Sequence, residues 1–254
     1  HRPVLGKAVY NDSAGNERYP TSSGGFIFDN KGTYQGISAL FSTPIKNISE
    51  YTFFMCLYLG TDVTSSMIPP FQGNTLNPLI SGLHTFSGSF ADFQDFAAIR
   101  YQMSASNSFF FNTTPQSGNE GIYIQNNGGG GMITNSVFVS MSAAVRPAPL
   151  EKHILTVSVS GSGAIKVRKN GVQVFATGSS VLSGSKYTFH TIGAEHYQFV
   201  NNPSTSIVFP NLGFPQQQNL DGVIFDSAMA DSFMTDGDMY AMEKTIAARN
   251  GLSI

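Results

Sequence analysis

Hydrophobic and polar residues alternate with a period of two along most of this chain, and clusters of Gly, Asn, Pro and Ser interrupt the alternation. A period of two places successive side chains on opposite faces of a β-strand, and the interrupting residues are those that form turns. About a dozen such runs predict two packed sheets or a barrel. The predicted strands cover Val4–Tyr10, Gly25–Phe28, Tyr51–Leu59, Pro78–Ser81, Phe96–Met103, Gly121–Gln125, Ser136–Met141, Lys152–Ser160, Ala164–Arg168, Val172–Ala176, Thr188–Gly193 and Leu220–Asp226.

The clearest segment runs from His153 to Ala176. Apolar residues alternate with polar ones in its three runs, a Ser-Gly-Ser-Gly sequence separates the first two, and Asn170-Gly171 separates the last two. An Asn-Gly pair suits a two-residue type I′ hairpin, because both central residues of that turn need a positive φ. We therefore expect a three-stranded meander with one buried face and one face in water.

The C-terminal residues carry the one pattern that is typical of a helix. Thr235 and Asp238 have the spacing of a capping box, with Asp in place of Glu. Met239, Met242 and Ile246 recur at helical spacing, so we expect this face of the helix to pack against the sheets. The pair at residues 250–251, Asn-Gly, is a C-terminal stop sequence.

Length and composition narrow the class of protein. All-β sandwiches of 254 residues are often one domain, so we expect a single domain over residues 1–254. A formal net charge of -2 argues against a nucleic-acid partner, and no apolar run approaches the ~20 residues of a membrane helix. Only 12% of the residues are charged, against roughly 25% in an average domain. A surface of uncharged polar residues is common in secreted and virion proteins, so we expect an extracellular or virion location.

The single cysteine, Cys56, excludes an intrachain disulfide. It lies in the apolar run TFFMCLYLG, which indicates a buried, unreactive thiol.

Several segments of the second half resemble the concanavalin A-like lectin and glucanase superfamily, and in particular its laminin-G-like branch. The resemblance is specific over about the last 100 residues and general in character before them. Its strand segments are Ile154–Val159, Ile165–Val167 with Asn170-Gly171, Phe189–Gly193 and Gly222–Asp226. Its later segments are a turn at Met229-Ala230-Asp231 and a helix that ends in Arg249-Asn250-Gly251-Leu252.

The resemblance implies a two-sheet antiparallel β-sandwich of the jelly-roll, concanavalin A-like kind, closed by one short C-terminal helix. Members of the superfamily bind or cleave carbohydrates, and many bind calcium. The chain has no Trp, whereas the sugar-cleaving members usually have several, and this departure weakens the glucanase interpretation. Because the matching motifs are structural, they specify a fold and leave the activity open.

The spacing of carboxylates and histidines in the sequence matches no catalytic motif that we considered. Glycosidases need two carboxylates at a defined separation, and Asp92 and Asp95 would face opposite sides of one strand. They are better explained as a turn and a strand edge. No histidine lies near a nucleophile elbow, and His84, His190 and His196 are better explained as packed or surface residues than as catalytic ones. We therefore favour a binding protein over an enzyme.

Calcium is a candidate cofactor because it takes carboxylate, amide and carbonyl oxygens from loops. Asp221, Asp226 and Asp231 are the candidate ligands, although no complete calcium-loop motif is present. The triplet Asp236-Gly237-Asp238 is better explained as a helix N-terminus, where negative charge is favourable. No His or Cys cluster has zinc spacing.

Two loops place aromatic side chains beside amides, a combination that lectins use for sugar rings and their hydroxyl groups. The candidate ligand-binding residues are Tyr197, Phe199, Asn201 and Asn202 in one loop and Phe71, Gln72 and Asn74 in the other. The alternative interpretation is that these aromatics anchor their loops to the core.

Three functions remain open. The first is a non-catalytic carbohydrate-binding or adhesion module with a glycan or polysaccharide partner, as part of a virion or phage tail fibre or of a bacterial surface protein. The second is a structural or assembly domain of such an appendage, which would form homo-oligomers. The third is a polysaccharide-cleaving enzyme of the same fold.

Overall fold

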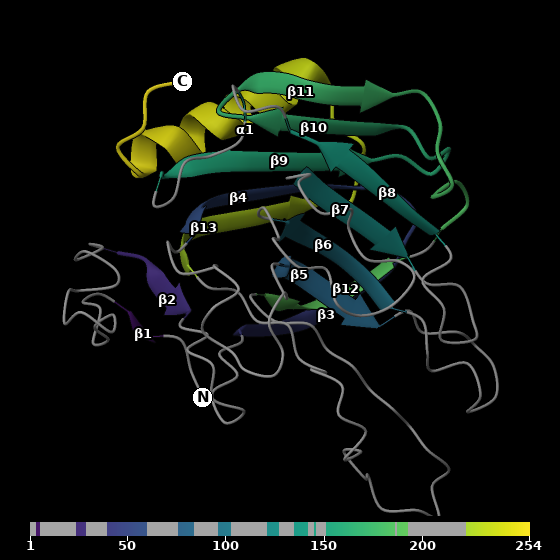
Figure 1. Ribbon diagram of the computed structural model, residues 1–254, viewed down its shortest axis with the longest axis horizontal. Helices are drawn as coiled ribbons and strands as arrows, with labels where there is room; N and C mark the ends of the chain where they lie inside the picture. The colour runs from purple at the N-terminus through teal and green to yellow at the C-terminus, as the bar shows by residue number, and fades with distance from the viewer. Residues whose placement is uncertain are drawn as a thin grey trace, which may run out of the picture.

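The computed structural model describes residues 4–5, 24–28, 40–59, 76–83, 96–102, 121–126, 135–141, 145, 151–185, 187–192 and 222–254. These residues form thirteen strands in two antiparallel sheets and one C-terminal helix (Figure 1). The two-sheet antiparallel fold with a single C-terminal helix is therefore confirmed. No helix in this part of the chain is long and apolar enough to cross a bilayer.

The larger sheet has seven strands in the order β1-β2-β13-β4-β9-β10-β11. Its strands are antiparallel to their neighbours throughout. Their bounds are β1 Val4–Leu5, β2 Phe26–Phe28, β13 Gly222–Ala230, β4 Tyr51–Leu59, β9 His153–Val159, β10 Ile165–Lys169 and β11 Val172–Thr177.

The smaller sheet has six strands in the order β3-β12-β5-β6-β7-β8. These pairs are antiparallel as well. The bounds are β3 Leu40–Ile48, β12 Tyr187–Ile192, β5 Leu76–Leu83, β6 Phe96–Gln102, β7 Gly121–Asn126 and β8 Asn135–Ser140.

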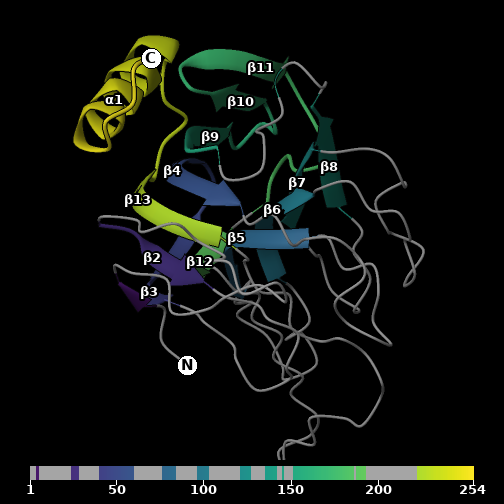
Figure 2. The same ribbon diagram turned by 60° about the vertical axis from the view of Figure 1, so that its left-hand side comes forward.

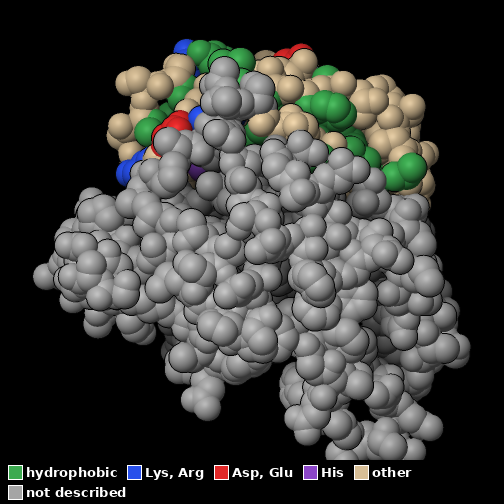
Figure 3. Space-filling view, viewed as in Figure 1, with side chains coloured by type: hydrophobic (Ala, Val, Ile, Leu, Met, Phe, Trp, Pro, Cys, Tyr) green, Lys and Arg blue, Asp and Glu red, His purple; other side chains and the backbone are tan. Residues whose placement is uncertain are grey.

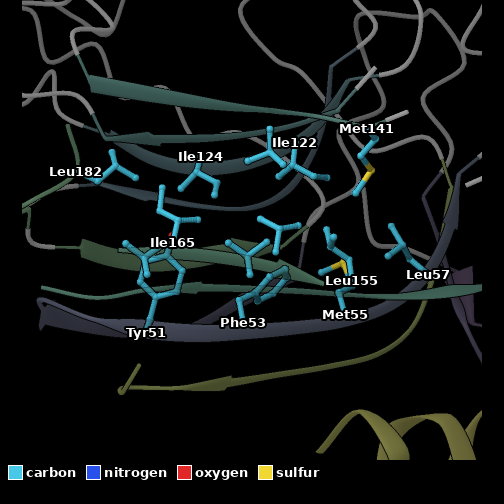
Figure 4. Close-up of a cluster of buried hydrophobic side chains, with 14 of the residues drawn as sticks. Tyr51, Phe53, Met55, Leu57, Ile122, Ile124, Met141, Leu155, Ile165 and Leu182 are labelled. Atoms are coloured by element: carbon cyan, nitrogen blue, oxygen red, sulfur yellow. The ribbon is translucent and has the colours of Figure 1, made fainter. Parts of the chain in front are cut away.

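The main core lies between the two sheets. Figure 4 shows Tyr51, Phe53 and Met55 of the seven-stranded sheet facing Ile122 and Ile124 of the six-stranded sheet. All five side chains are fully or almost fully buried, as strand alternation predicts for the inward face. The sandwich therefore owes its main stabilisation to apolar surface from both sheets.

A second, smaller core lies on the other side of the seven-stranded sheet. There α1 (Asp236–Arg249) packs against β9 and β4, and Figure 2 shows the helix on the side of that sheet away from β5–β8. The buried residues of this core include Met239, Ile246 and Ala247 of the helix, and Met242 packs at its margin. The predicted packing face of the helix is confirmed.

Both ends of α1 follow the sequence signals. The Thr235 hydroxyl accepts a hydrogen bond from the Asp238 backbone N–H at 3.2 Å and donates one to the Asp238 carboxylate at 2.6 Å. At the other end Asn250 caps the helix, and Gly251 takes a φ of +67°. A left-handed residue after the cap is a common way to end a helix, and glycine adopts it without strain.

The β10–β11 hairpin confirms the predicted turn. Asn170 and Gly171 have φ of 49° and 79°, the positive values that a type I′ turn requires. The Asn170 side chain also accepts a hydrogen bond from the backbone N–H of Ile154 at 2.8 Å, which ties the turn to the start of β9.

Strand β3 is absent from the predicted strands. Its sequence, LFSTPIKNI, contains Pro44, which cannot donate a backbone hydrogen bond and so argues against a strand interior. In the described sheet β3 is an edge strand, where proline is tolerated. Pro78 lies inside β5, next to a register shift between Pro78 and Ile80.

Two expectations about strands were wrong. The meander was expected to have one face in water, but every residue of β9 is buried because α1 covers its outer side. Met229-Ala230 was expected to start a turn, but both residues belong to β13, where they pair with Phe53 and Thr52. Of the predicted first strand, only Val4–Leu5 lies within the described residues, and there it is a strand.

Candidate functional site

The ligand-binding loops predicted from the sequence lie outside the described residues. This holds for Tyr197, Phe199, Asn201 and Asn202 and equally for Phe71, Gln72 and Asn74. The same is true of Asp92, Asp95, Asp221, His84 and His196. These assignments stay predictions.

The described aspartates that were candidate calcium ligands lie apart from one another. Asp226 accepts from Arg249 Nη2 at 2.7 Å and lies 3.4 Å from Asn250 Nδ2, while Asp231 is exposed. Within the described ranges, no three His, Cys, Asp or Glu residues gather as a metal site would require. Asp236 begins α1, as expected, and its hydrogen bond from Lys166 at 2.7 Å holds the pKa of its carboxyl below its usual range.

Two potentially reactive side chains, Cys56 and His153, are buried and uncharged at pH 7. Burial raises the pKa of the Cys56 thiol to about 12, which confirms the prediction of an unreactive cysteine. Burial also lowers the pKa of His153 to about 4, so its ring is neutral at pH 7. His153 Nδ1 lies 2.9 Å from the carbonyl oxygen of Glu151 and donates to it, because a carbonyl can only accept.

A polar cluster joins α1 to the outer face of the seven-stranded sheet. Glu243 of the helix is wholly buried, and its carboxylate accepts from Arg168 Nε at 3.0 Å and from Arg168 Nη2 at 3.1 Å. The hydroxyl of Thr156 donates to the same carboxylate at 2.7 Å. Arg168 Nη2 also donates to the carbonyl oxygen of Gly171 at 2.6 Å, which connects the cluster to the hairpin.

A second polar contact fixes the segment that leads into the helix. The Thr52 hydroxyl lies 2.7 Å from the Ser158 hydroxyl and 2.7 Å from the carbonyl oxygen of Ser232, and it accepts from the backbone N–H of Met234 at 3.1 Å. Buried polar groups of this kind are tolerated only when they are hydrogen-bonded. The helix α1 therefore packs on the outer face of the seven-stranded sheet, and no ligand can bind where the helix covers that face.

The opposite outer face, on the six-stranded sheet, has a different character. The register aligns Arg100, Tyr123 and Phe138 across β6, β7 and β8. Ile122, Ile124 and Val139 are buried in the core. Phe138, the strand neighbour of Val139, is half-buried, and alternation assigns it to the face opposite the core.

The flanking rows of the same register contain polar and small residues. We call this surface the β6–β8 face, and the helix does not cover it, because α1 packs on the other sheet. Its register positions are Ala98, Gln125 and Ser136 in one row, Arg100, Tyr123 and Phe138 in the next, and Gln102, Gly121 and Ser140 in the third.

The ring of Phe138 is the best-defined aromatic of this face. It is half-buried and lies over Gly121, since a Cβ added there would be 2.7 Å from Cε2 and 2.8 Å from Cζ of Phe138. The same Cβ would meet the carbonyl oxygen of Val139, so no residue larger than glycine fits at position 121 without a shift. The missing side chain leaves room for the ring, and Ser140, two residues further along β8, is exposed.

The sequence contains a pattern that could have identified the buried Glu243, but none that brings Gly121 and Phe138 together. Glu243 stands four residues after Met239 and three before Ile246, on the apolar side of the helix, which indicates a buried carboxylate. Gly121 and Phe138 lie in predicted strands, but their contact depends on a register that the residues alone do not determine.

Neither the known protein-family models nor the curated proteins contain a match to this chain. Solved structures do resemble it, at low identity. The binding domain of botulinum neurotoxin serotype D/C VPI 5993 is 11% identical with a TM-score of 0.44, and the alignment covers 78% of this chain and 37% of that one. The binding domain of botulinum neurotoxin DC in complex with SialylT is 10% identical with a TM-score of 0.37, covering 78% and 36%.

A structure of NanB with Optactamide is 14% identical with a TM-score of 0.41, and the alignment covers 81% of this chain and 27% of that one. The present chain therefore spans about a third of the length of these structures. The likeness to the laminin-G-like branch stays a resemblance in sequence.

Proposed function

We propose that this chain is a non-catalytic carbohydrate-binding module that holds a saccharide against the β6–β8 face. The observation that carries the proposal is the half-buried Phe138 ring over Gly121, in the same strand as the exposed Ser140. An aromatic ring offers an apolar surface to the C–H groups of a sugar, while neighbouring amides and hydroxyls can bond its hydroxyl groups. Gln125 and Ser136, which carry an amide and a hydroxyl, are register partners in the adjacent row of these strands.

The composition supports an adhesion role outside the cell or on a virion. Only 12% of the residues are charged, and over the described part Figure 3 shows few charged side chains among the apolar ones. We place the module in a phage or virion fibre or a bacterial surface protein, in line with its laminin-G-like sequence features. The loop residues Tyr197–Asn202 and Phe71–Asn74 are proposed as additional ligand contacts.

The proposal is tested with a glycan array, followed by retention on columns of the polysaccharides that give signals. Phe138→Ala should lose most of the retention, because it removes the apolar platform. Tyr240→Ala is the matched control, since Tyr240 is also a partly exposed aromatic but lies on α1, on the other side of the molecule. It should bind like the wild type.

Other outcomes lead to different functions. Loss of polymer viscosity on incubation would establish a polysaccharide-cleaving enzyme in place of a binding module. An empty array at high protein concentration would contradict carbohydrate binding.

A structural or assembly domain is the second candidate, and one observation favours it. Strand β11 is the last strand of its sheet, contains no charged residue and exposes Val172 by 63%. Edge strands without charges are prone to pair with another chain. Homo-oligomers in sedimentation equilibrium without any glycan binding would support this candidate over the first.

A further inference from the structure

Strand β11 is an edge of the seven-stranded sheet. Within the described part of the chain it pairs with β10 on one side and with no strand on the other (Figure 1). Its residues Val172, Gln173 and Ala176 are exposed. The outer backbone groups of an edge strand can form hydrogen bonds with an extended strand of another molecule.

The edge is uncharged and apolar. Residues 171–185, which include β11 and the turns that follow it, contain no Asp, Glu, Lys or Arg, and β11 contains no proline. Among the described residues, the two most exposed large apolar side chains are Val172 at 63% and Val181 at 56%, and both lie in this stretch. Charged residues and proline are devices that prevent edge strands from pairing. Because the stretch is neutral, the same strand of a second copy meets no charge repulsion here.

Two exposed residues of β11, Gln173 and Ala176, lie on the helix side of the sheet. Their partners on β10 are Arg168 and Lys166, which both bond to carboxylates of α1. Residues directly opposite each other in an antiparallel pair lie on the same face. A shift in register passes over Val174, so Gln173 and Ala176 share one face although they are three positions apart.

The other paired residues of β11 lie on the core side, where Phe175 packs against the main core. When β11 pairs antiparallel with its own copy, the faces match along the strand if Val172 lies opposite Thr177 and Gln173 lies opposite Ala176. A register shift of one residue would set the helix side of one copy against the core side of the other. The sequence of β11 is therefore complementary to itself in one defined register.

We infer that β11 is a self-association surface, on which β11 of a second copy of this chain pairs antiparallel about a two-fold axis. Gln173 of each copy then lies opposite Ala176 of the other, and the two seven-stranded sheets form one continuous sheet. The assembly closes with two copies, because the same strand serves on both sides. The inference gives the assembly domain its partner and its geometry, and it does not depend on saccharide binding.

Sedimentation equilibrium over a wide range of concentrations tests the association. We expect a monomer–dimer equilibrium for the wild type. Val172→Glu should weaken the dimer at least about tenfold, because it places a charge from each copy in the interface. Thermal unfolding at the wild-type temperature would show that the variant is folded.

Ala248→Glu is the matched control. Ala248 is an exposed residue of α1, next to Arg249, which pairs with Asp226 of β13. Strands β4, β9 and β10 separate β13 from β11 in the sheet. The same change of charge at this position should leave the dimer unchanged.

Disulfide cross-linking tests the register. A variant that combines Gln173→Cys with Ala176→Cys should form a covalent dimer when oxidised with copper phenanthroline, and a reducing agent should separate it. Opposite residues of an antiparallel pair have Cα atoms about 4.5–5.5 Å apart, within the range of a disulfide. Gln173→Cys alone should cross-link poorly, because the two copies of residue 173 are not opposite each other. The native Cys56 does not interfere, since burial raises the pKa of its thiol to about 12.

A monomer at every concentration would overturn the inference, and so would a dimer that Val172→Glu leaves intact. Larger polymers would overturn it as well, because they require head-to-tail contacts in place of a two-fold pair. Equal cross-linking by Gln173→Cys alone and by the double variant would contradict the register. None of these measurements uses a saccharide, so a glycan array with the same preparations tests the proposed function separately.

Discussion

The outer faces of the two sheets have similar strand patterns but differ in the burial of their described polar residues. On the seven-stranded sheet the polar residues Thr156 and Ser158 alternate with core residues, yet both are wholly buried beneath the helix side of the molecule. On the six-stranded sheet the equivalent position Ser140 is exposed, next to the half-buried Phe138. A polar residue in an alternating strand therefore shows which residues face away from the core, but not whether that face meets water, a helix or a ligand.

The difference has an energetic consequence. Beneath α1 each polar group needs a fixed partner, because burying an unpaired charge or hydroxyl is costly. The carboxylate of Glu243 meets this need with Arg168 and Thr156. Among the described residues no helix lies above the β6–β8 face, and Ser140 on that face is exposed.

The largest expected effect comes from breaking the contact beneath the helix. Glu243→Ala should lower the free energy of unfolding by about 3–5 kcal/mol, because it leaves the guanidinium group of Arg168 buried without its carboxylate. Urea denaturation measures the change.

The control is Lys166→Ala, which breaks the more exposed pair with Asp236 and should cost at most about 1 kcal/mol. The double variant Arg168→Met with Glu243→Leu should recover much of the loss, since an apolar pair of similar size avoids the buried charges. A cost for Glu243→Ala no larger than that of the control would show that the cluster does not hold the helix.

His153 predicts a pH dependence on the same sheet. Its pKa is about 4 in the folded state and about 6.5 when unfolded, so the unfolded chain binds more protons between these values. The neutral ring contributes fully to the free energy of unfolding above pH 6.5. This contribution is lost as pH falls towards 4, and the loss is about 3 kcal/mol at most.

The measurement is the free energy of unfolding of wild type and His153→Asn from pH 4 to pH 7. Asparagine offers a side-chain N–H to the carbonyl oxygen of Glu151 but does not titrate. As pH falls from 7 to 4, the free energy of unfolding should decrease more for the wild type than for His153→Asn. Parallel curves would mean that His153 is not responsible.

A smaller effect is expected on the ligand side of the comparison. Phe138→Ala should weaken saccharide binding by about threefold to tenfold, in line with the ~0.5–1.5 kcal/mol of an aromatic stacking contact. Calorimetry with a glycan selected on the array measures it. Phe138→Leu, which retains apolar area but no flat ring, should lie between the two; a leucine variant as weak as alanine would argue against stacking.

The smallest expected effect concerns the helix start. Thr235→Ala removes the cap and should cost about 1 kcal/mol of stability. Thr245→Ala, at an exposed position whose hydroxyl only bonds back to the Ala241 carbonyl oxygen, should change stability by less than about 0.5 kcal/mol. Thermal unfolding compares the two, and equal shifts would contradict the role of the cap.

The fold could be predicted from the sequence to a large extent because its signals are local. Alternation identified most strands, Asn170-Gly171 identified the hairpin, and Thr235 with Asp238 identified the helix start. Strand β3 was missed because Pro44 is compatible with an edge strand only, and edge status depends on the rest of the sheet.

The candidate site was less accessible from the sequence because it depends on contacts between distant segments. Phe138 meets Gly121 only through the β7–β8 register, and Glu243 meets Arg168 across 75 residues of chain. The loop residues around Tyr197 and Phe71 were selected by composition alone and remain predictions.

The central claim is that a saccharide binds to the β6–β8 face. The most direct test is one glycan array run with wild type, Phe138→Ala and Tyr197→Ala, with calcium and again with EDTA. We predict specific signals for the wild type that weaken in Phe138→Ala and persist in EDTA. Signals that are unchanged in Phe138→Ala but lost in Tyr197→Ala or in EDTA would place the ligand on the loops or at a calcium site and contradict the claim.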